Sequence, residues 1–202
     1  MHKLFENIEL IAFDIMGVII TEPSMVRNGL HPMYKDKYSY DYVKDLYNKA
    51  KINVDGDLQL WKGLEVKDPV KARKELLESF KKDRGFNRFR RYLSRKGFRK
   101  GVISNMPGNF GDYFIEKFKL KKDFDPILIS ADIGVAKPDF GKYDEFLNRA
   151  QIRGEKVLFI DDKRRNLEMA KRFGFKTVQF DRGREQGGPK PDMIIKSFKE
   201  LM

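Results

Sequence analysis

The chain has 202 residues, no cysteine and a formal net charge of +12. This length suits one domain, or one domain with an insertion, and it can bury a core without disulfides. The lack of cysteine excludes disulfide frameworks, thiolate zinc sites and thiol catalysis, and it favours a reducing, cytoplasmic location. We expect no membrane segment, because no apolar run approaches the ~20 residues that span a bilayer and the N-terminus lacks the order of a signal peptide.

Six short runs of apolar and β-branched residues predict strands. These runs are residues 10–15, 100–104, 126–130, 157–161, 176–180 and, more weakly, 193–196. Helical periodicity fills the gaps between the later runs. One helix is expected over 139–150 behind Asp139, a good N-cap, with Phe140 and Tyr143 on its buried face. Another is expected over 164–173 ahead of Gly174, a good C-cap. Apolar strands that alternate with helices predict an α/β fold, a doubly wound parallel sheet covered on both faces.

The segment from about residue 21 to 83 interrupts this alternation, because it contains no convincing strand. Tyr38, Tyr42, Leu46 and Ala50 recur at a spacing of four residues, which predicts helix. We therefore expect a small helical subdomain, the helical insert (residues 21–83), within a core domain formed by residues 1–20 and 84–202. Trp61 and the tyrosines of the insert are expected to form its own core rather than to line a substrate pocket.

Residues 81–100 carry most of the positive charge. They hold ten Lys or Arg and one Asp, a local net charge of +9, which leaves +3 for the other 182 residues. Phe86, Phe89 and Leu93 share one helical face, so we expect a helix that packs this face on the sheet. Clustered basic residues are also typical of nucleic-acid interfaces, but we favour the packed helix and expect no nucleic-acid partner.

Polar and charged side chains follow the predicted strands, at the edge of a parallel sheet where ligands bind. They are Asp14 after the first strand, Ser104 and Asn105 after the second, Lys137 in the loop after the third, and Asp161 and Asp162 after the fourth. Three carboxylates at one edge require a cation. Hard oxygen ligands without Cys or His select Mg²⁺, which completes its shell with water and phosphate oxygens.

Four segments in this order resemble the motifs of the haloacid dehalogenase superfamily, whose members are mostly Mg²⁺-dependent phosphohydrolases. They are LIAFDIMGVI, GVISN, GVAKPDFGKY and VLFIDDKRRNLEMAKRFGF. The resemblance covers residues 8–20 and about 85–201. It implies a Rossmann-like core, a helical cap of the C1 type at the position of the insert, and a small phosphorylated molecule as the substrate.

The resemblance also implies roles for single residues. Asp14 would be the nucleophile that forms an aspartyl phosphate, Ser104 and Asn105 would bind the phosphoryl group, and Lys137 would offset charge between nucleophile and phosphate. Asp161 and Asp162 would hold Mg²⁺ together with Asp14 and the backbone carbonyl of residue 16. Asn166 matches an Asn found in several subfamilies, which we expect to contact the acidic pair rather than substrate.

Residue 16 departs from the family pattern. The family's phosphatases have a second Asp two positions after the nucleophile, as general acid and base, whereas this chain has Met16. A thioether carries no proton, so a factor of roughly 10²–10⁴ is missing at that position. We therefore expect a slow or leaving-group-selective phosphatase. The alternatives are a catalytically impaired phosphate-binding module and, less favoured, a phosphonatase or a dehalogenase.

Overall fold

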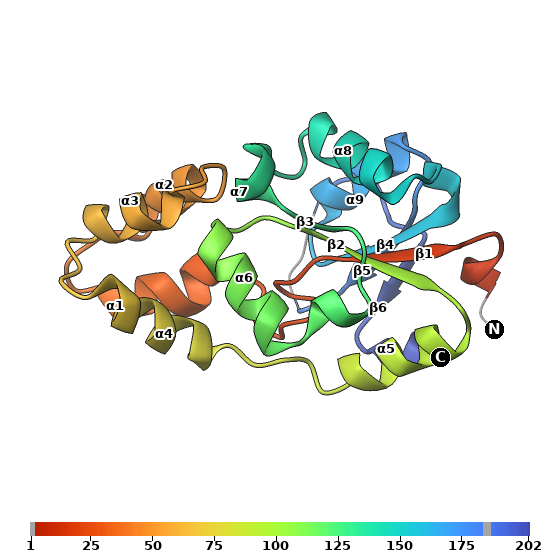
Figure 1. Cartoon of the computed structure of the whole chain (residues 1–202), viewed down its shortest axis with the longest axis horizontal. Coiled ribbons are helices and arrows are strands. Elements are labelled where there is room, and N and C mark those ends of the chain that lie inside the picture. Colours follow the sequence, from red (N-terminus) through yellow and green to blue (C-terminus); the bar gives the residue numbers. More distant parts are fainter. Residues whose placement is uncertain (1–2, 184–186) are drawn as a thin grey trace.

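A computed structural model describes residues 3–183 and 187–202. Its centre is a six-stranded sheet in the order β3-β2-β1-β4-β5-β6, in which every neighbouring pair is parallel (Figure 1). The strands are β1 (Leu10–Phe13), β2 (Arg99–Ser104), β3 (Ile127–Ile129), β4 (Val157–Asp161), β5 (Lys176–Phe180) and β6 (Met193–Ile195). All six predicted strands are therefore present, and the predicted doubly wound parallel sheet is confirmed.

Helices cover both faces of the sheet (Figure 1). They are α5 (Phe86–Arg95), α6 (Gly108–Lys117), α7 (Ser130–Ile133), α8 (Phe140–Ala150) and α9 (Arg164–Arg172), with short 3₁₀ turns η1 (Lys3–Phe5), η3 (Leu120–Lys122), η4 (Gly154–Lys156) and η5 (Phe198–Leu201). Alternate residues of β1 enter different cores, since strand side chains point to opposite faces. Phe13 packs with α5 and α6, whereas Ala12 packs with α8 and α9. The strand that precedes Asp14 is therefore fixed from both sides.

The helical insert contains η2 (Val26–Leu30), a π-helical turn, followed by α1 (His31–Tyr34), α2 (Tyr40–Ala50), α3 (Gly56–Gly63) and α4 (Pro69–Ser79). These helices lie beyond one end of the sheet (Figure 1). The Ser39 side chain caps α2 and the Asp68 side chain caps α4. Trp61 is fully buried, with its ring centroid 5.9 Å from that of Phe110 in α6. The boundaries of the insert and of the core domain stay a prediction.

The two segments that enter and leave the insert are hydrogen-bonded to each other. Ile20 and Lys82 form an antiparallel bridge, the Thr21 amide donates to the Lys81 carbonyl at 3.0 Å, and the Asp83 amide donates to the Ile19 carbonyl at 2.8 Å. We call this pairing of residues 19–21 with 81–83 the double crossing.

Arg182 anchors the double crossing to the core. Its guanidinium donates to the Gly17 carbonyl at 2.8 Å and to the Asp83 carboxylate at 2.9 Å. The same guanidinium lies 3.8 Å from the centroid of the Phe180 ring, in β5. The crossing is therefore tied to the loop after β1 and to the end of β5.

The apolar face of residues 81–100 is packed, while most of the Lys and Arg residues of this segment are exposed. Phe86, Phe89 and Leu93 are fully buried, as predicted for a helix against the sheet. Arg90 does not face solvent freely, because it forms an ion pair with Asp123 and donates to the Phe118 carbonyl at 2.9 Å.

Two expectations about helices were incomplete or wrong. The periodicity did not predict α6, although Phe110 and Phe114 of this helix are fully buried. Phe140 was expected on the buried face of α8, but it is 62% exposed and lies beside Phe173, because Phe146 fills the core instead. Among the described residues, no helix is long and apolar enough to cross a bilayer.

Candidate active site

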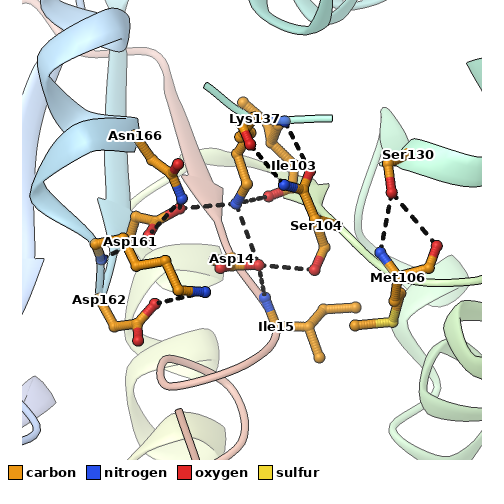
Figure 2. A network of polar contacts seen from close by, with 12 residues as sticks. Asp14, Ile15, Ile103, Ser104, Met106, Ser130, Lys137, Asp161, Asp162 and Asn166 are labelled. Carbon is orange, nitrogen blue, oxygen red and sulfur yellow. Dashed lines mark hydrogen bonds and ion pairs between the residues drawn. The ribbon is translucent and has the colours of Figure 1, made fainter. Parts of the chain in front are cut away.

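The predicted strand-end residues come together at one edge of the sheet. Strand β1 lies between β2 and β4, and Phe13 pairs in register with Val102 and with Ile160. Asp14 follows β1 directly, Ser104 ends β2 and Asp161 ends β4. All three side chains are therefore brought side by side, as Figure 2 shows, and all three are buried.

Asp14 is held by three donors that share its Oδ1 atom. The Ile15 amide and the Ser104 hydroxyl each donate to Oδ1 at 2.7 Å, and the Lys137 ammonium lies 3.2 Å from it. Only 3% of Asp14 is exposed. This carboxylate has a fixed orientation at the mouth of the sheet edge, which is what an attacking group requires.

Lys137 links Asp14 to the acidic pair, Asp161 and Asp162. Its Nζ contacts Asp161 Oδ2 at 2.7 Å and donates to the Ile103 carbonyl at 2.5 Å, in addition to its contact with Asp14. The Asn105 side chain brackets the backbone of Lys137, accepting from its amide at 2.9 Å and donating to its carbonyl at 2.8 Å. Asn105 therefore positions Lys137, a role that the sequence did not indicate.

Asp14, Asp161 and Asp162 each offer a carboxylate oxygen, and these oxygens all lie within 4.8 Å of one another. Burial raises the pKa of Asp161, against the opposing effect of Lys137. Burial also raises the pKa of Asp162 to about 7, and the negative charges of Asp161 and Asp14 add to this. A bound divalent cation would relieve this repulsion, so the donor set fits a hard cation such as Mg²⁺.

Asn166 and Lys163 surround the acidic pair. The Asn166 amide donates to both carboxylate oxygens of Asp161, at 3.0 and 2.9 Å. The Lys163 ammonium lies 3.8 Å from Asp162 Oδ1. Asn166 thus contacts the acidic pair as expected, whereas the sequence analysis did not single out Lys163.

Gly17 lets the loop after β1 approach the acidic pair. Its φ is +76°, which L residues other than glycine rarely adopt. A Cβ atom at this position would lie only 2.7 Å from Asp162 Cγ. Both the backbone conformation and the space therefore require glycine next to this carboxylate.

A cavity of about 200 Å³ opens over these residues, between the sheet edge and the insert. Asp14, Asn105, Lys137 and Asn166 line it from the core, and Met16, buried except for 4% of its surface, lies in its wall. The insert contributes residues that the sequence analysis did not connect with the site: Pro23, Ser24, Met25, Val26, Tyr40, Lys44, Tyr47, Asn48 and Lys51. Tyr40 and Tyr47 therefore line the cavity, contrary to the expectation for the tyrosines of the insert, while Trp61 does not.

Lys163 and Arg165 also line the cavity from the start of α9. A sequence signal for them existed, because the run Lys163-Arg164-Arg165 begins a predicted helix, where cations are unfavourable. No comparable signal marked Lys44 or Lys51, whose place depends on how the insert packs on the core.

A family model described as haloacid dehalogenase-like hydrolase matches residues 11–180. One relative, a phosphoglycolate phosphatase of Salmonella choleraesuis, is 26% identical over 114 residues, which are 54% of this chain. The match spans only 45% of that relative's length.

Two solved structures have the same fold. A HAD phosphatase from Thermococcus onnurineus superposes with a TM-score of 0.75 at 18% identity, over 96% of both chains. A HAD family enzyme from Bacteroides thetaiotaomicron, solved in complex with magnesium and inorganic phosphate, superposes with a TM-score of 0.67 at 16% identity, over 88% of this chain and 96% of that one.

Proposed function

Since the chain belongs to the haloacid dehalogenase-like hydrolase family, we propose that it is a Mg²⁺-dependent phosphohydrolase in which Asp14 attacks the phosphoryl group of a small phosphorylated substrate. Asp14 would take the phosphoryl group as an aspartyl phosphate, and water would then hydrolyse this intermediate. Two displacements replace one difficult step, which is the general advantage of covalent catalysis. The phosphoglycolate phosphatase among the relatives supports this class of reaction.

The observation that carries the proposal is the fixed carboxylate of Asp14, which lies beside the buried ammonium of Lys137 and the carboxylates of Asp161 and Asp162. Lys137 would offset the negative charge that accumulates when Asp14 meets a phosphate. Ser104 would turn its hydroxyl from Asp14 to a phosphoryl oxygen. Asn105 would position Lys137 through its side chain and would donate its backbone amide to the phosphoryl group. These roles agree with general electrostatic stabilisation of phosphoryl transfer.

Mg²⁺ would be held by Asp14, Asp161, Asp162 and the Met16 carbonyl. When bound, the ion supplies charge neutralisation at the phosphoryl oxygens. The likeness to an enzyme solved with magnesium and phosphate supports this choice of cation. The four helices of the insert would act as a cap, because the cavity lies between them and the sheet edge.

Met16 makes the proposed activity selective for the leaving group. Met16 lines the cavity, and its thioether cannot protonate a departing alkoxide, so alkyl phosphates should react slowly. Aryl and acyl phosphates have acidic leaving groups and need little protonation. The same observation favours a second candidate, a phosphate-binding module without useful turnover.

The proposal is tested with a panel of aryl, acyl and alkyl phosphates, assayed with and without Mg²⁺ on the wild-type protein and on Asp14→Asn. We expect Mg²⁺-dependent hydrolysis of the activated esters that disappears in Asp14→Asn. Activity that survives this substitution would mean that Asp14 is not the nucleophile. Binding of phosphate without hydrolysis of any ester would favour the second candidate.

Met16→Asp separates the two candidates further. Met16→Asn is the matched control, because Asn has the shape of Asp but no acidic proton. For a leaving-group-selective phosphatase, we expect Met16→Asp to raise the turnover of an alkyl phosphate at least tenfold. Met16→Asn should not. Equal rates in the two variants would refute the role assigned to residue 16.

A further inference from the structure

Three cations on the cavity wall have no part in the proposed reaction. Lys44 belongs to α2, Lys51 is the C-cap of α2, and Arg165 lies in the first turn of α9. We call these three residues the cation triad. Two come from the insert and one from the core, yet all line the same cavity as Asp14.

No carboxylate neutralises the triad within residues 3–183 and 187–202. Lys51 Nζ donates to the neutral Asn48 side chain at 2.7 Å, and Lys44 Nζ lies 5.9 Å from the centroid of the Tyr40 ring. Lys137 and Lys163, by contrast, already face Asp14, Asp161 and Asp162. Three positive charges therefore remain beside the cavity after the acidic cluster has its own cations.

The triad is also held in an electrostatically unfavourable arrangement. Burial and the positive charges of Arg165, Lys163 and Lys44 lower the pKa of Lys51 to about 8. Arg165 lies at the N-terminal end of α9, which has Lys163 as its N-cap and no acidic residue in its first turn. Cations at a helix N-terminus are unfavourable, and an anion there is favourable. Local rules are broken in this way mainly at functional sites.

The end of α2 that carries Lys51 is fixed to the core. The Ser130 hydroxyl donates to the Lys51 carbonyl and accepts from the Met106 amide at 3.0 Å, and Figure 2 shows the Ser130 contact with Met106. The Tyr47 hydroxyl, one turn earlier in α2, donates to the Asn105 carbonyl at 3.4 Å. Lys51 is thus set at a defined position beside the phosphate-binding edge.

We propose that the cation triad is a subsite for a second anionic group, so that the favoured substrates are small phosphomonoesters that also carry a carboxylate or a second phosphate. The inference rests on the proposed phosphohydrolase function. It adds that the end of the substrate remote from the reacting phosphate is read by Lys44, Lys51 and Arg165. The cavity of about 200 Å³ restricts the substrate to a small molecule.

Binding of non-hydrolysable phosphonates tests this subsite without turnover. Titration calorimetry with excess Mg²⁺ would compare phosphonoacetate, methylenebisphosphonate and propylphosphonate, which carry a carboxylate, a second phosphonate and an apolar end. For the wild-type protein we expect phosphonoacetate, methylenebisphosphonate or both to bind tenfold or more tightly than propylphosphonate, which has no second anionic group. Comparison of the first two probes identifies the second anion.

The variants Lys51→Met and Arg165→Met should each lose most of this ratio of affinities. Lys49→Met is the matched control, because Lys49 lies on the same helix but pairs with Asp45 and does not line the cavity. Equal affinities of all three probes in the wild-type protein would overturn the inference. So would a ratio that Lys51→Met and Arg165→Met leave unchanged.

These outcomes are independent of the proposed reaction. Asp14-dependent hydrolysis of aryl phosphate without a preference among the phosphonates would refute the subsite and leave the phosphohydrolase function standing. A preference among the phosphonates that depends on the cation triad, in a protein that hydrolyses no ester, would support the subsite and refute the phosphohydrolase function.

Discussion

Lys142 is a buried lysine whose replacement should stabilise the protein. It lies in α8 and has no exposed surface, and its Nζ atom has no hydrogen-bond partner among the described residues. Burial, together with the positive charges of Lys137 and Arg149, lowers the pKa of this amine to about 6, against the opposite effect of Asp132 and Asp14. The side chain is therefore mostly neutral in the folded protein at pH 7.

The magnitude follows from linkage between protonation and folding. In the unfolded chain a lysine has a pKa near 10.4, so at pH 7 it binds a proton that the folded protein does not bind. Each unit of pKa difference is worth about 1.4 kcal/mol, which gives a cost of roughly 5 kcal/mol at pH 7. Because the folded-state pKa is lowered, this cost is greatest below about pH 6 and falls as the pH rises towards the unfolded value.

Lys142→Met keeps the length of the side chain and removes the amine. We expect this variant to gain several kcal/mol in free energy of unfolding at pH 7, with the advantage shrinking by about 1.4 kcal/mol for each pH unit between 7 and 9. Urea unfolding at pH 7 and pH 9 measures both quantities. Lys121→Met, at an exposed position, is the control. A variant that is less stable than wild type, or an advantage that does not change with pH, would refute the reasoning.

Three further predictions concern the acidic cluster, formed by Asp14, Asp161 and Asp162, and helix α5. Because the pKa of Asp162 is raised to about 7, protons should compete with Mg²⁺ below that pH, so the rise in Tm on adding Mg²⁺ should be larger at pH 8 than at pH 5.5; an equal rise would contradict it. Gly17→Ala should lower the free energy of unfolding by about 1–3 kcal/mol and weaken Mg²⁺ binding, whereas Gly183→Ala, with a similar φ of +75° but open space around it, should affect stability alone. Arg90→Met should cost about 1–3 kcal/mol in urea unfolding, since it leaves Asp123 with Lys100 alone and removes the donor to the Phe118 and Lys119 carbonyls; no loss would show that packing alone holds α5.

The sequence predicted the parts of the fold that depend on local patterns. The apolar runs located all six strands, and the residues at their ends, such as Asp14 and Asp161, meet because parallel strands end at one edge. Helix α6 was not predicted, since its glycines at 108 and 111 obscure the helical pattern. Gly111 is required there by packing, because a Cβ would lie 2.9 Å from Ile129.

The wall of the cavity could not be predicted from local patterns. The positions of Lys44 and Lys51 depend on contacts between the insert and the core, such as the one from Ser130 to Lys51, and these join residues far apart in the sequence. The role of Asn105 was missed for the same reason, since its partner is the backbone of Lys137. Residue types at strand ends indicate the chemistry, whereas the residues that select a substrate come from tertiary packing.

The double crossing limits how the insert can move. Two covalent connections that are hydrogen-bonded to each other, and held by Arg182 through Gly17 and Asp83, resist twisting far more than two separate strands would. Opening of the insert would have to break the hydrogen bonds from Ser130 to Lys51 and from Tyr47 to Asn105, and the ribbon would limit the movement to bending about one axis rather than rotation or sliding over the sheet edge. Closing would then return Lys51 to the same place on the cavity wall, so the cavity would be rebuilt with the same shape.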